Sequence, residues 1–267
     1  MAECVMPKDA ENQFEERGFF VVRNILSEGA VLAVRKEIER IIEVEDGFQL
    51  DKNRTDNVQT EGADAVRAVR VRNFLSEVLW KRWFTAPDVV ALQKRFVGDN
   101  VKVQGTSFFT KPAQIGEGAP WHQDIWLWAR QPGDPTREYK MRHLSCWIAL
   151  EPVDLENGCL HVVPGIHNED IVEHVKYDDG VHEEIPRELT EDITREPVPL
   201  HTGDAVVWHA KMWHMSPPNP SDRTRWGGVI VTLPAEMAVG AKQDNRPYLI
   251  RDGRVCDHPK GLGIQNR

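Results

Sequence analysis

The stretch VKVQGTSFFT, residues 101–110, marks the point at which the chain becomes rich in short β-type segments. Such runs of β-branched and aromatic residues, bounded by turn residues, are typical of strands. Four more follow, separated by Gly and Pro: 143–150 (HLSCWIAL), 159–163 (CLHVV), 205–208 (AVVW) and 226–233 (WGGVIVTL). Several short strands after a helical start predict a mainly β fold, a β-sandwich or jelly roll with flanking helices.

Upstream of these strands the pattern is helical. Residues 28–43 carry apolar side chains at helical spacing after Ser27, a suitable N-cap, and a second helix is predicted over 87–96. Both helices are interpreted as scaffold. We therefore expect a single domain over 1–267, with a helical part at about 1–98, a β core at about 100–235 and a tail at 236–267.

Long connections separate the predicted strands at 112–120, 131–139 and about 168–201, and the last of them is acidic. Loops of this length in a compact domain are usually functional or disordered. The segment 168–201 is interpreted as a lid over a site, and a solvated surface excursion is the alternative.

The composition excludes some classes of protein. The chain has 267 residues, 40% hydrophobic and 28% charged, which is ordinary for a folded soluble protein. A formal net charge of -9 argues against nucleic acid as the main partner, since nucleic-acid binders usually carry a basic stripe. The one basic cluster, Arg67, Arg70 and Arg72, alternates with valines, so it reads as a strand or helix face, with a local anion site as the alternative.

Neither a long apolar run nor a basic-then-apolar start is found, so we expect no membrane partner and a cytoplasmic location. The four cysteines, Cys4, Cys146, Cys159 and Cys256, are scattered without a CxxC motif, which predicts reduced thiols. Cys146 and Cys159 lie in apolar runs and are expected in the core.

The motif that carries chemistry is WHQD at 121–124. In an extended chain, residues two apart point to the same side, so the imidazole of His122 and the carboxylate of Asp124 reach one ion together. A second His downstream would leave three positions open on iron(II), two for a bidentate 2-oxo acid and one for dioxygen. A structural zinc site would instead be closed by four protein ligands.

Two histidines compete for that place, His209 and His214, and periodicity alone does not choose between them. The residues that follow favour His214: Ser216, Asn219 and then Arg225, eleven positions after the His. A guanidinium is the expected partner for the distal carboxylate of 2-oxoglutarate, because Arg is planar, bidentate and always charged. A surface ion pair with Asp222 is the alternative for Arg225.

Together these residues resemble the phytanoyl-CoA hydroxylase family, which includes ectoine hydroxylases, within the 2-oxoglutarate oxygenases. The motifs that carry the resemblance are WHQD at 121–124, MRHLSCWIAL with Glu-Pro at 141–152, ENGCLHVVPGIH at 156–167, and GDAVVWHAKMWHMSPPN at 203–219 followed by Arg225. They cover about residues 100–235 in the family's order.

The resemblance implies a double-stranded β-helix, a cupin-like jelly roll, with iron(II) on His122, Asp124 and His214 and 2-oxoglutarate on Arg225. Matching positions imply that Ser216, Trp147 and Lys111 also contact 2-oxoglutarate and that Gln104 faces the substrate. The sequence departs from the ectoine enzymes by one additional residue between Gln104 and Lys111. The turn at Asn157-Gly158 joins two strands, and His167 is interpreted as structural.

The resemblance also implies the reaction. An unactivated C–H bond of a small metabolite is oxidised, most simply by hydroxylation, while dioxygen is consumed and 2-oxoglutarate becomes succinate. Related halogenases replace the carboxylate ligand with a small residue, so Asp124 disfavours halogenation. We hypothesise that Trp126 and Trp128, which follow Asp124 on its side of an extended chain, line the substrate pocket.

Two rival functions are weighed against this one. A non-catalytic jelly-roll protein could use the three residues only to bind a metal or ligand, and a cupin-type metalloenzyme could work without 2-oxoglutarate. Arg225 argues against both. The other histidines show no ligand-like spacing within one strand: His143, His161, His167, His201 and His209. The substrate's identity and the oligomeric state are not readable from the sequence.

Overall fold

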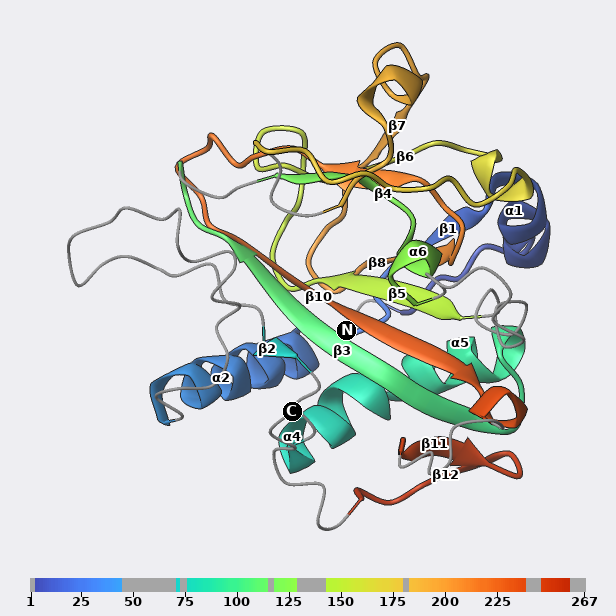
Figure 1. Cartoon of the computed structure of the whole chain (residues 1–267). Helices are drawn as coiled ribbons and strands as arrows, with labels where there is room; N and C mark the ends of the chain where they lie inside the picture. Colours follow the sequence, from blue (N-terminus) through green and yellow to red (C-terminus); the bar gives the residue numbers. More distant parts are fainter. Residues whose placement is uncertain are drawn as a thin grey trace.

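The computed structural model describes residues 3–44, 71–72, 76–114, 118–128, 143–179, 183–238 and 246–259. Within them the chain forms two antiparallel β-sheets, with helices against the outer face of the larger one (Figure 1). The predicted connection at 131–139 and the arginines Arg67 and Arg70 lie outside the described residues, as does the side chain of Arg72.

The larger sheet, called here the major sheet, has eight strands in the order β1-β8-β5-β10-β3-β11-β12, with β2 beside β3. Its centre is the long pair β10 and β3, in which Arg225 lies opposite Lys111 at one end and Pro234 opposite Val101 at the other. The strands are β1 (Phe19–Val22), β2 (Val71–Arg72), β3 (Val101–Lys111), β5 (Leu144–Ala149), β8 (Ala205–His209), β10 (Arg225–Pro234), β11 (Tyr248–Arg251) and β12 (Arg254–Val255).

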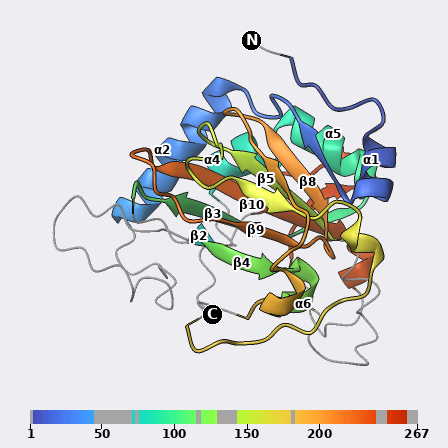
Figure 2. The same ribbon diagram turned by 90° about the horizontal axis from the view of Figure 1, so that it is seen from above.

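The smaller sheet, called here the minor sheet, has the order β4-β9-β6-β7 and lies across the interior from the major sheet (Figures 1 and 2). In its register, His122 of β4 is opposite His214 of β9. Its strands are β4 (Ala119–His122), β6 (Leu160–Val162), β7 (Glu196–Val198) and β9 (His214–Ser216).

Helices cover the outer face of the major sheet. The α-helices are α1 (Ala10–Arg17), α2 (Glu28–Val44), α4 (Glu77–Leu79), α5 (Pro87–Phe96) and α6 (Asp124–Trp128); α4 continues as the π-helical turn η1 (Trp80–Phe84), and the 3-10 turns are η2 (Ile166–Asn168), η3 (Arg187–Leu189) and η4 (Ala235–Ala238). The helix predicted over 28–43 is confirmed as α2, with the Ser27 hydroxyl accepting from the N–H of Ala30 at 3.3 Å. The helix predicted over 87–96 is confirmed as α5.

Strand alternation divides the major sheet into two faces with separate cores. On β5, Cys146 and Ile148 pack under α2, α4 and α5, whereas Trp147 and Ala149 point to the interior between the sheets. Fully burying one such apolar side chain stabilises the fold by about 1.5–3 kcal/mol. Because the outer face is filled by helices, the polar side chains of a site between the sheets must come from interior-facing positions.

The segment 168–201 covers the outer face of the minor sheet over much of its described length. The Ile185 side chain, only 1% exposed, packs there against Trp121 and Trp213, and the Ile185 N–H donates to the carbonyl of Trp121 at 2.8 Å. The segment then supplies η3 and the strand β7. Its interpretation as a solvated excursion is therefore wrong for this packed part, and its role as a lid stays a prediction.

The predicted mainly β jelly roll with flanking helices is confirmed. The N-terminal part, expected to be helical, also contributes β1 at the edge of the major sheet, and the C-terminal part extends that sheet through β11 and β12. Cys146 and Cys159 are fully buried, and all four cysteines are free thiols, as predicted. Among the described helices, none has the length and apolar character needed to span a bilayer.

Candidate metal centre

Three side chains converge at one end of the minor sheet. His122 ends β4, Asp124 begins α6 and His214 begins β9. The Oδ1 atom of Asp124 lies 4.0 Å from Nε2 of His122 and 3.8 Å from Nε2 of His214, and the three ligand atoms lie within 4.8 Å of one another. Ligand bonds of about 2.1 Å place two donors on one ion roughly 3–4 Å apart, so this spacing suits a transition metal.

Hydrogen bonds fix which imidazole nitrogen faces the centre. The Nδ1 atom of His122 lies 2.8 Å from the Pro120 carbonyl, and Nδ1 of His214 lies 3.0 Å from the Met212 carbonyl. A carbonyl oxygen only accepts, so each Nδ1 carries the hydrogen and each Nε2 presents a lone pair. Metal-binding histidines are commonly oriented by such bonds to a backbone carbonyl.

Asp124 is held in the same manner. Its Oδ2 accepts hydrogen bonds from the Ser145 hydroxyl at 2.8 Å and from the Trp208 indole N–H at 3.0 Å. These two donors come from neighbouring strands of the major sheet, β5 and β8. Because they engage one oxygen, Oδ1 is left facing the two imidazoles as a single anionic donor.

Of the two competing histidines, the structure brings His214 to Asp124 and places His209 elsewhere. His209 lies against His167, with ring centroids 5.3 Å apart, and burial lowers the pKa of His209 to about 4, with His167 and Lys211 contributing. Within the described part of the chain, His122, Asp124 and His214 are the only group of three or more His, Cys, Asp or Glu with this spacing.

Arg225 and Lys111 lie opposite each other on β10 and β3, and both are buried. The Arg225 guanidinium donates through Nη1 to the Gly158 carbonyl, while its Nε has no partner. No described carboxylate forms an ion pair with it, so the alternative of a pair with Asp222 is wrong. Burial lowers the pKa of Arg225 to about 10, which leaves it a cation at neutral pH.

The other residues assigned to 2-oxoglutarate gather beside Arg225. The Lys111 ammonium donates to the Ser216 hydroxyl at 2.8 Å, and the Arg225 guanidinium lies over the Trp147 ring, 5.3 Å from its centroid. Trp147 packs closely on β10 because Gly227 has no side chain: a Cβ there would lie 2.0 Å from the indole. The geometry thus produces a buried cationic end of the interior.

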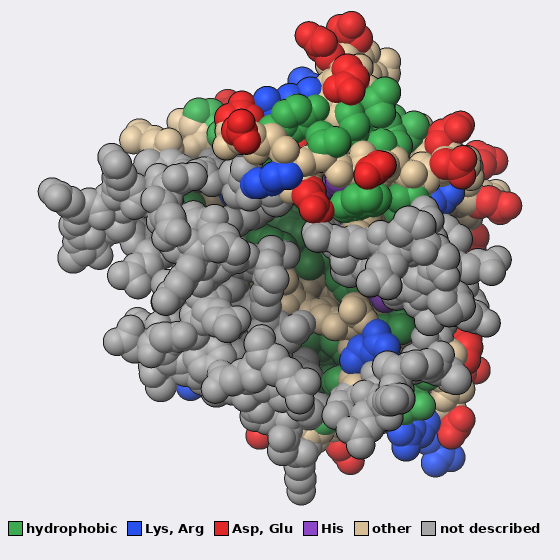
Figure 3. All heavy atoms as spheres, viewed as in Figure 1, with side chains coloured by type: hydrophobic (Ala, Val, Ile, Leu, Met, Phe, Trp, Pro, Cys, Tyr) green, Lys and Arg blue, Asp and Glu red, His purple; other side chains and the backbone are tan. Residues whose placement is uncertain are grey.

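Gln104 lies towards the opposite end of the same strands. It occupies a β-bulge of β3 next to Gly105. Gly105 pairs with Val231 of β10, which in turn pairs with Ser145 of β5, the residue whose hydroxyl donates to Asp124. The Arg246 guanidinium donates to the Gln104 amide oxygen. Figure 3 shows this face hollowed between the sheets, with hydrophobic and His side chains visible inside and a basic side chain at the edge.

The substrate-lining role of Trp126 and Trp128 stays a prediction, but its structural premise does not hold. The chain after Asp124 is the helix α6, so the extended-chain premise is wrong. Trp126 donates from its indole N–H to Glu183 at 3.0 Å and stacks on His174 at 5.0 Å between ring centroids. Trp128 ends this helix, and its side chain is outside the described residues.

Several residues around the centre were not found from the sequence. Ser145 has a local signal, because it is a polar residue at an interior-facing position of an otherwise apolar strand. The Asp124 contact of Trp208 and the contacts of Gln123 and His174 have no local signal, because each partner comes from a distant segment. His167 is buried with Nε2 on the Glu15 carbonyl, as befits a structural role, and Asn157 with Gly158 forms the turn before β6.

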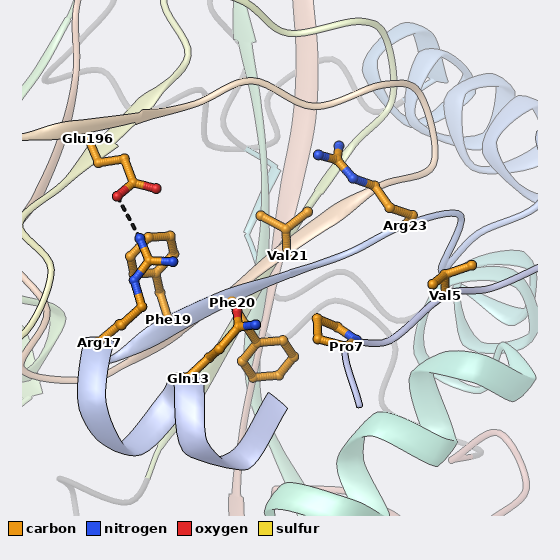
Figure 4. A pocket seen from close by; sticks show the side chains of 9 residues that line it. All are labelled: Val5, Pro7, Gln13, Arg17, Phe19, Phe20, Val21, Arg23 and Glu196. Atoms are coloured by element: carbon orange, nitrogen blue, oxygen red, sulfur yellow. Dashed lines mark hydrogen bonds and ion pairs between the residues drawn. The ribbon is translucent and has the colours of Figure 1, made fainter. Parts of the chain in front are cut away.

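A separate pocket of about 330 Å³ lies at the edge strand β1 and contains none of the three converging residues. Figure 4 shows Arg17 and Glu196 on one side of it, joined at 2.6 Å. Arg23 is paired as well, with Asp204 at 2.7 Å. Both arginines of this pocket are therefore paired with carboxylates of the protein, and neither is available to pair with an anionic ligand.

The residues present fit a metal ion with a diacid beside it. Two neutral imidazoles and one carboxylate form an open three-donor set, as in non-haem iron(II) oxygenases. The unpartnered Nε of buried Arg225 is a donor that a ligand carboxylate would satisfy, and leaving it unsatisfied costs about 1–3 kcal/mol. The chemistry of the donors therefore agrees with iron(II) and 2-oxoglutarate.

Comparison with known proteins agrees with this chemistry. The peroxisomal phytanoyl-CoA dioxygenase of Homo sapiens is 25% identical over 231 residues, 83% of this chain but 66%, just under two thirds, of the human enzyme. The L-proline trans-4-hydroxylase of Streptomyces griseoviridis is 28% identical over 234 residues, 81% of this chain and 82% of that enzyme.

Among solved structures, the non-heme alpha-ketoglutarate-dependent carbocyclase SnoK from nogalamycin biosynthesis is similar, with a TM-score of 0.63 and 25% identity over 93% of this chain and 87% of that one. The family model described as phytanoyl-CoA dioxygenase (PhyH) matches residues 14–227, which include strands β3, β5 and β8 of the major sheet, the whole minor sheet and all three converging residues. The chain belongs to the phytanoyl-CoA dioxygenase (PhyH) family.

Proposed function

We propose that this protein is an iron(II)- and 2-oxoglutarate-dependent dioxygenase that hydroxylates an unactivated C–H bond of a small molecule. The observation that carries the proposal is the cluster of His122, Asp124 and His214, each with one donor atom turned to a common point. Membership of the PhyH family and the names of its relatives, dioxygenases and hydroxylases, support it.

When bound, iron(II), 2-oxoglutarate and dioxygen supply an oxidant for aliphatic C–H bonds, with succinate and carbon dioxide as coproducts. The chain contributes the ligand set and its orientation. The carbonyls of Pro120 and Met212 accept from the two Nδ1 atoms and so turn the two Nε2 atoms to the centre, and Ser145 with Trp208 holds the Asp124 carboxylate to one donor oxygen.

At the cationic end of the interior, Arg225 would pair with the distal carboxylate of 2-oxoglutarate. Ser216 adds a hydroxyl there, held by Lys111, and Trp147 closes one side of the guanidinium. These groups are buried, so water is largely excluded and the charge-assisted hydrogen bonds are stronger than at a surface.

The substrate would enter from the end marked by Gln104, since Arg225 and Lys111 occupy the other end of the same strands. The polar contact between Gln104 and Arg246 favours a substrate with a polar or charged group on that side. The L-proline hydroxylase relative is named for a small amino acid, which supports a small-molecule substrate.

An anaerobic titration tests the metal and 2-oxoglutarate directly. Iron(II) followed by 2-oxoglutarate should produce the weak visible charge-transfer band of the chelate in the wild-type protein. His214→Ala should lose the band, and the matched variant His209→Ala, which removes a nearby imidazole outside the cluster, should keep it. A wild-type protein without the band, or an unchanged band in His214→Ala, would refute the proposal.

The type of oxidation is tested with candidate substrates. A small metabolite that stimulates succinate formation should gain one oxygen atom, measured as a mass increase that carries label from ¹⁸O₂. A product that has lost hydrogen but gained no oxygen would contradict hydroxylation. The similarity to a solved carbocyclase makes this outcome informative. That result would retain the cofactors and replace hydroxylation by cyclisation or desaturation.

A further inference from the structure

Gln123, the residue between the two proposed ligands of the His-X-Asp motif, is fully buried and joins three segments of the chain. Its amide nitrogen donates to the Lys211 carbonyl at 3.0 Å, and its amide oxygen accepts from the N–H of Val172 at 2.9 Å. Its own backbone N–H donates to Nε2 of His174 at 2.9 Å. Both polar ends of its side chain are thus engaged by protein atoms.

His174 is fixed from its other side. Its Nδ1 lies 2.9 Å from the Val172 carbonyl, so Nδ1 carries the hydrogen and Nε2 is the acceptor for Gln123. Its ring stacks on Trp126 with an interplanar angle of 4°, and the Trp126 indole N–H donates to Glu183. The His174 side chain is only 5% exposed, and it bridges the motif at 121–124 and the segment 168–201.

The same segment is attached at a second place. Ile185 donates its N–H to the Trp121 carbonyl, and Val175 pairs with Glu184 through two backbone hydrogen bonds of 2.9 Å or less. The two arms of the segment, at 172–175 and 183–185, therefore pair with each other and hold the motif at Gln123 and at Trp121. We call these two arms the clasp.

The motif needs such support because it lies between elements. His122 is the last residue of β4 and Asp124 the first of α6, so Gln123 belongs to neither a strand nor a helix. The relative direction of the two ligand side chains depends on the backbone at Gln123. That backbone is held by His174, and the Gln123 side chain ties it to Lys211, three residues before His214.

We propose that Gln123 is a positioning residue that couples the clasp to the metal centre, so that metal binding orders the clasp and an intact clasp raises metal affinity. The inference rests on the proposed function, which supplies the metal. Gln123 acts through its neighbours, because its amide oxygen and nitrogen are occupied by Val172 and Lys211. Outer partners of metal sites typically change metal affinity by about 10–100-fold.

The experiment uses cobalt(II) as a spectroscopic probe on the full chain, with visible absorption for affinity and hydrogen exchange of the Val172 amide for the clasp. In the wild type, cobalt(II) should slow exchange at Val172. In Gln123→Leu, which keeps the side-chain size and removes both hydrogen bonds, cobalt(II) affinity should fall at least about tenfold and Val172 should exchange fast with or without metal.

His174 provides a second route that leaves the Gln123 side chain intact. His174→Ala should weaken cobalt(II) binding in the same direction, and His174→Gln, whose amide oxygen can accept the Gln123 N–H, should restore most of it. The matched control is Asp179→Ala, which removes the Arg187–Asp179 ion pair of 2.8 Å outside the clasp, leaves Arg187 paired with Glu184, and should leave cobalt(II) affinity unchanged.

Wild-type cobalt(II) affinity in both Gln123→Leu and His174→Ala would overturn the coupling while leaving the proposed metal centre intact. An equal loss in Asp179→Ala would also overturn it, since the effect would then be general loosening of the segment. Failure of the wild-type protein to bind cobalt(II), or wild-type binding by His214→Ala, would instead overturn the metal centre itself.

Discussion

At the scale of single residues, the centre is built so that each converging side chain has one atom bound to the protein and one turned inwards. His122 and His214 use Nδ1 for backbone carbonyls, and Asp124 uses Oδ2 for Ser145 and Trp208. This arrangement fixes the direction of the donors, and the tautomer of the two neutral imidazoles, before any ion binds, which reduces the cost of ordering them.

Trp208→Phe should weaken metal binding without unfolding the protein. The variant keeps an aromatic ring in the interior core and removes the N–H that donates to Asp124 at 3.0 Å. We expect iron(II) or cobalt(II) affinity to fall by about tenfold, measured by titration of the apoprotein. Trp226→Phe, on the helix-covered face of the major sheet, is the control, and an equal effect there would contradict the assignment.

Arg225→Lys should reduce 2-oxoglutarate affinity by about 10–100-fold, because a charge-assisted hydrogen bond contributes roughly 1.5–3 kcal/mol and Lys lacks the bidentate fork. With a pKa lowered only to about 10 by burial, Arg225 stays charged, so wild-type affinity should be nearly constant from pH 7 to 9. A buried Lys has a pKa lowered by the same desolvation, so the variant's affinity should fall as pH rises. Titration of the anaerobic iron(II) protein at several pH values tests both; pH-independent binding in the variant would contradict the second.

At the scale of elements, the strands were predictable because their signal is local. The five β-type runs correspond to β3, β5, β6, β8 and β10, and the helix predicted after Ser27 begins where its hydroxyl caps the first turn. The pairing of His122 with His214 follows from two short strands meeting in the minor sheet. The convergence of Arg225, Lys111, Ser216 and Trp147 agrees with the resemblance to the family, which supplied their roles.

Other parts of the site could not be predicted from local pattern. Helix α6 spans only Asp124–Trp128, too short for a hydrophobic period to show, so Trp126 was placed on an extended chain. Its partners, Glu183 and His174, come from about fifty residues later in the sequence. A contact of that kind depends on tertiary packing, and one sequence alone contains no signal for it.

Gly227→Ala tests the close fit between β10 and Trp147. The new Cβ would lie 2.0 Å from the indole, so Trp147 must move or the strand must shift, and overpacking of this kind costs about 1–3 kcal/mol of unfolding free energy. Urea unfolding should show that loss. Gly29→Ala, in helix α2 with open space around it, should instead stabilise by up to about 1 kcal/mol. Equal stability of the two variants would contradict this packing.

At the scale of the whole molecule, stability should fall in mild acid through His209. Its folded pKa, lowered by burial to about 4, lies below the unfolded value of 6.5, so between these limits the unfolded chain binds the proton more readily. Stability is therefore lost as pH falls from 6.5 towards 4, by about 2 kcal/mol at pH 5 relative to pH 7.

His209→Asn removes this titration and retains an acceptor for the Lys211 N–H, which bonds to Nδ1 of His209 at 3.1 Å. Unfolding free energies from urea titrations at pH 7 and pH 5 should differ less in the variant than in the wild type. His167, whose pKa burial also lowers, keeps part of the acid sensitivity in both proteins. An identical pH 5 loss in the variant would rule out His209 as its source.

The whole molecule has three layers: helices, the major sheet with the interior beneath it, and the minor sheet with its cover. Trp121 precedes His122 in β4, and Trp213 precedes His214 at the start of β9, so that the two indoles lie in the outer cluster while the two imidazoles face inwards. In a regular strand, adjacent residues point to opposite faces.

Because of this alternation, insertions and deletions near either histidine should be constrained during evolution of the gene. A one-residue shift of either Trp-His pair relative to its sheet would exchange indole and imidazole, and would lose the inward donors and the outer cluster in a single event. A change of two residues preserves the facing and displaces the donor along the strand. Length variation should therefore be tolerated in the connection 112–118 and selected against within β4 and at the start of β9, where these pairs lie.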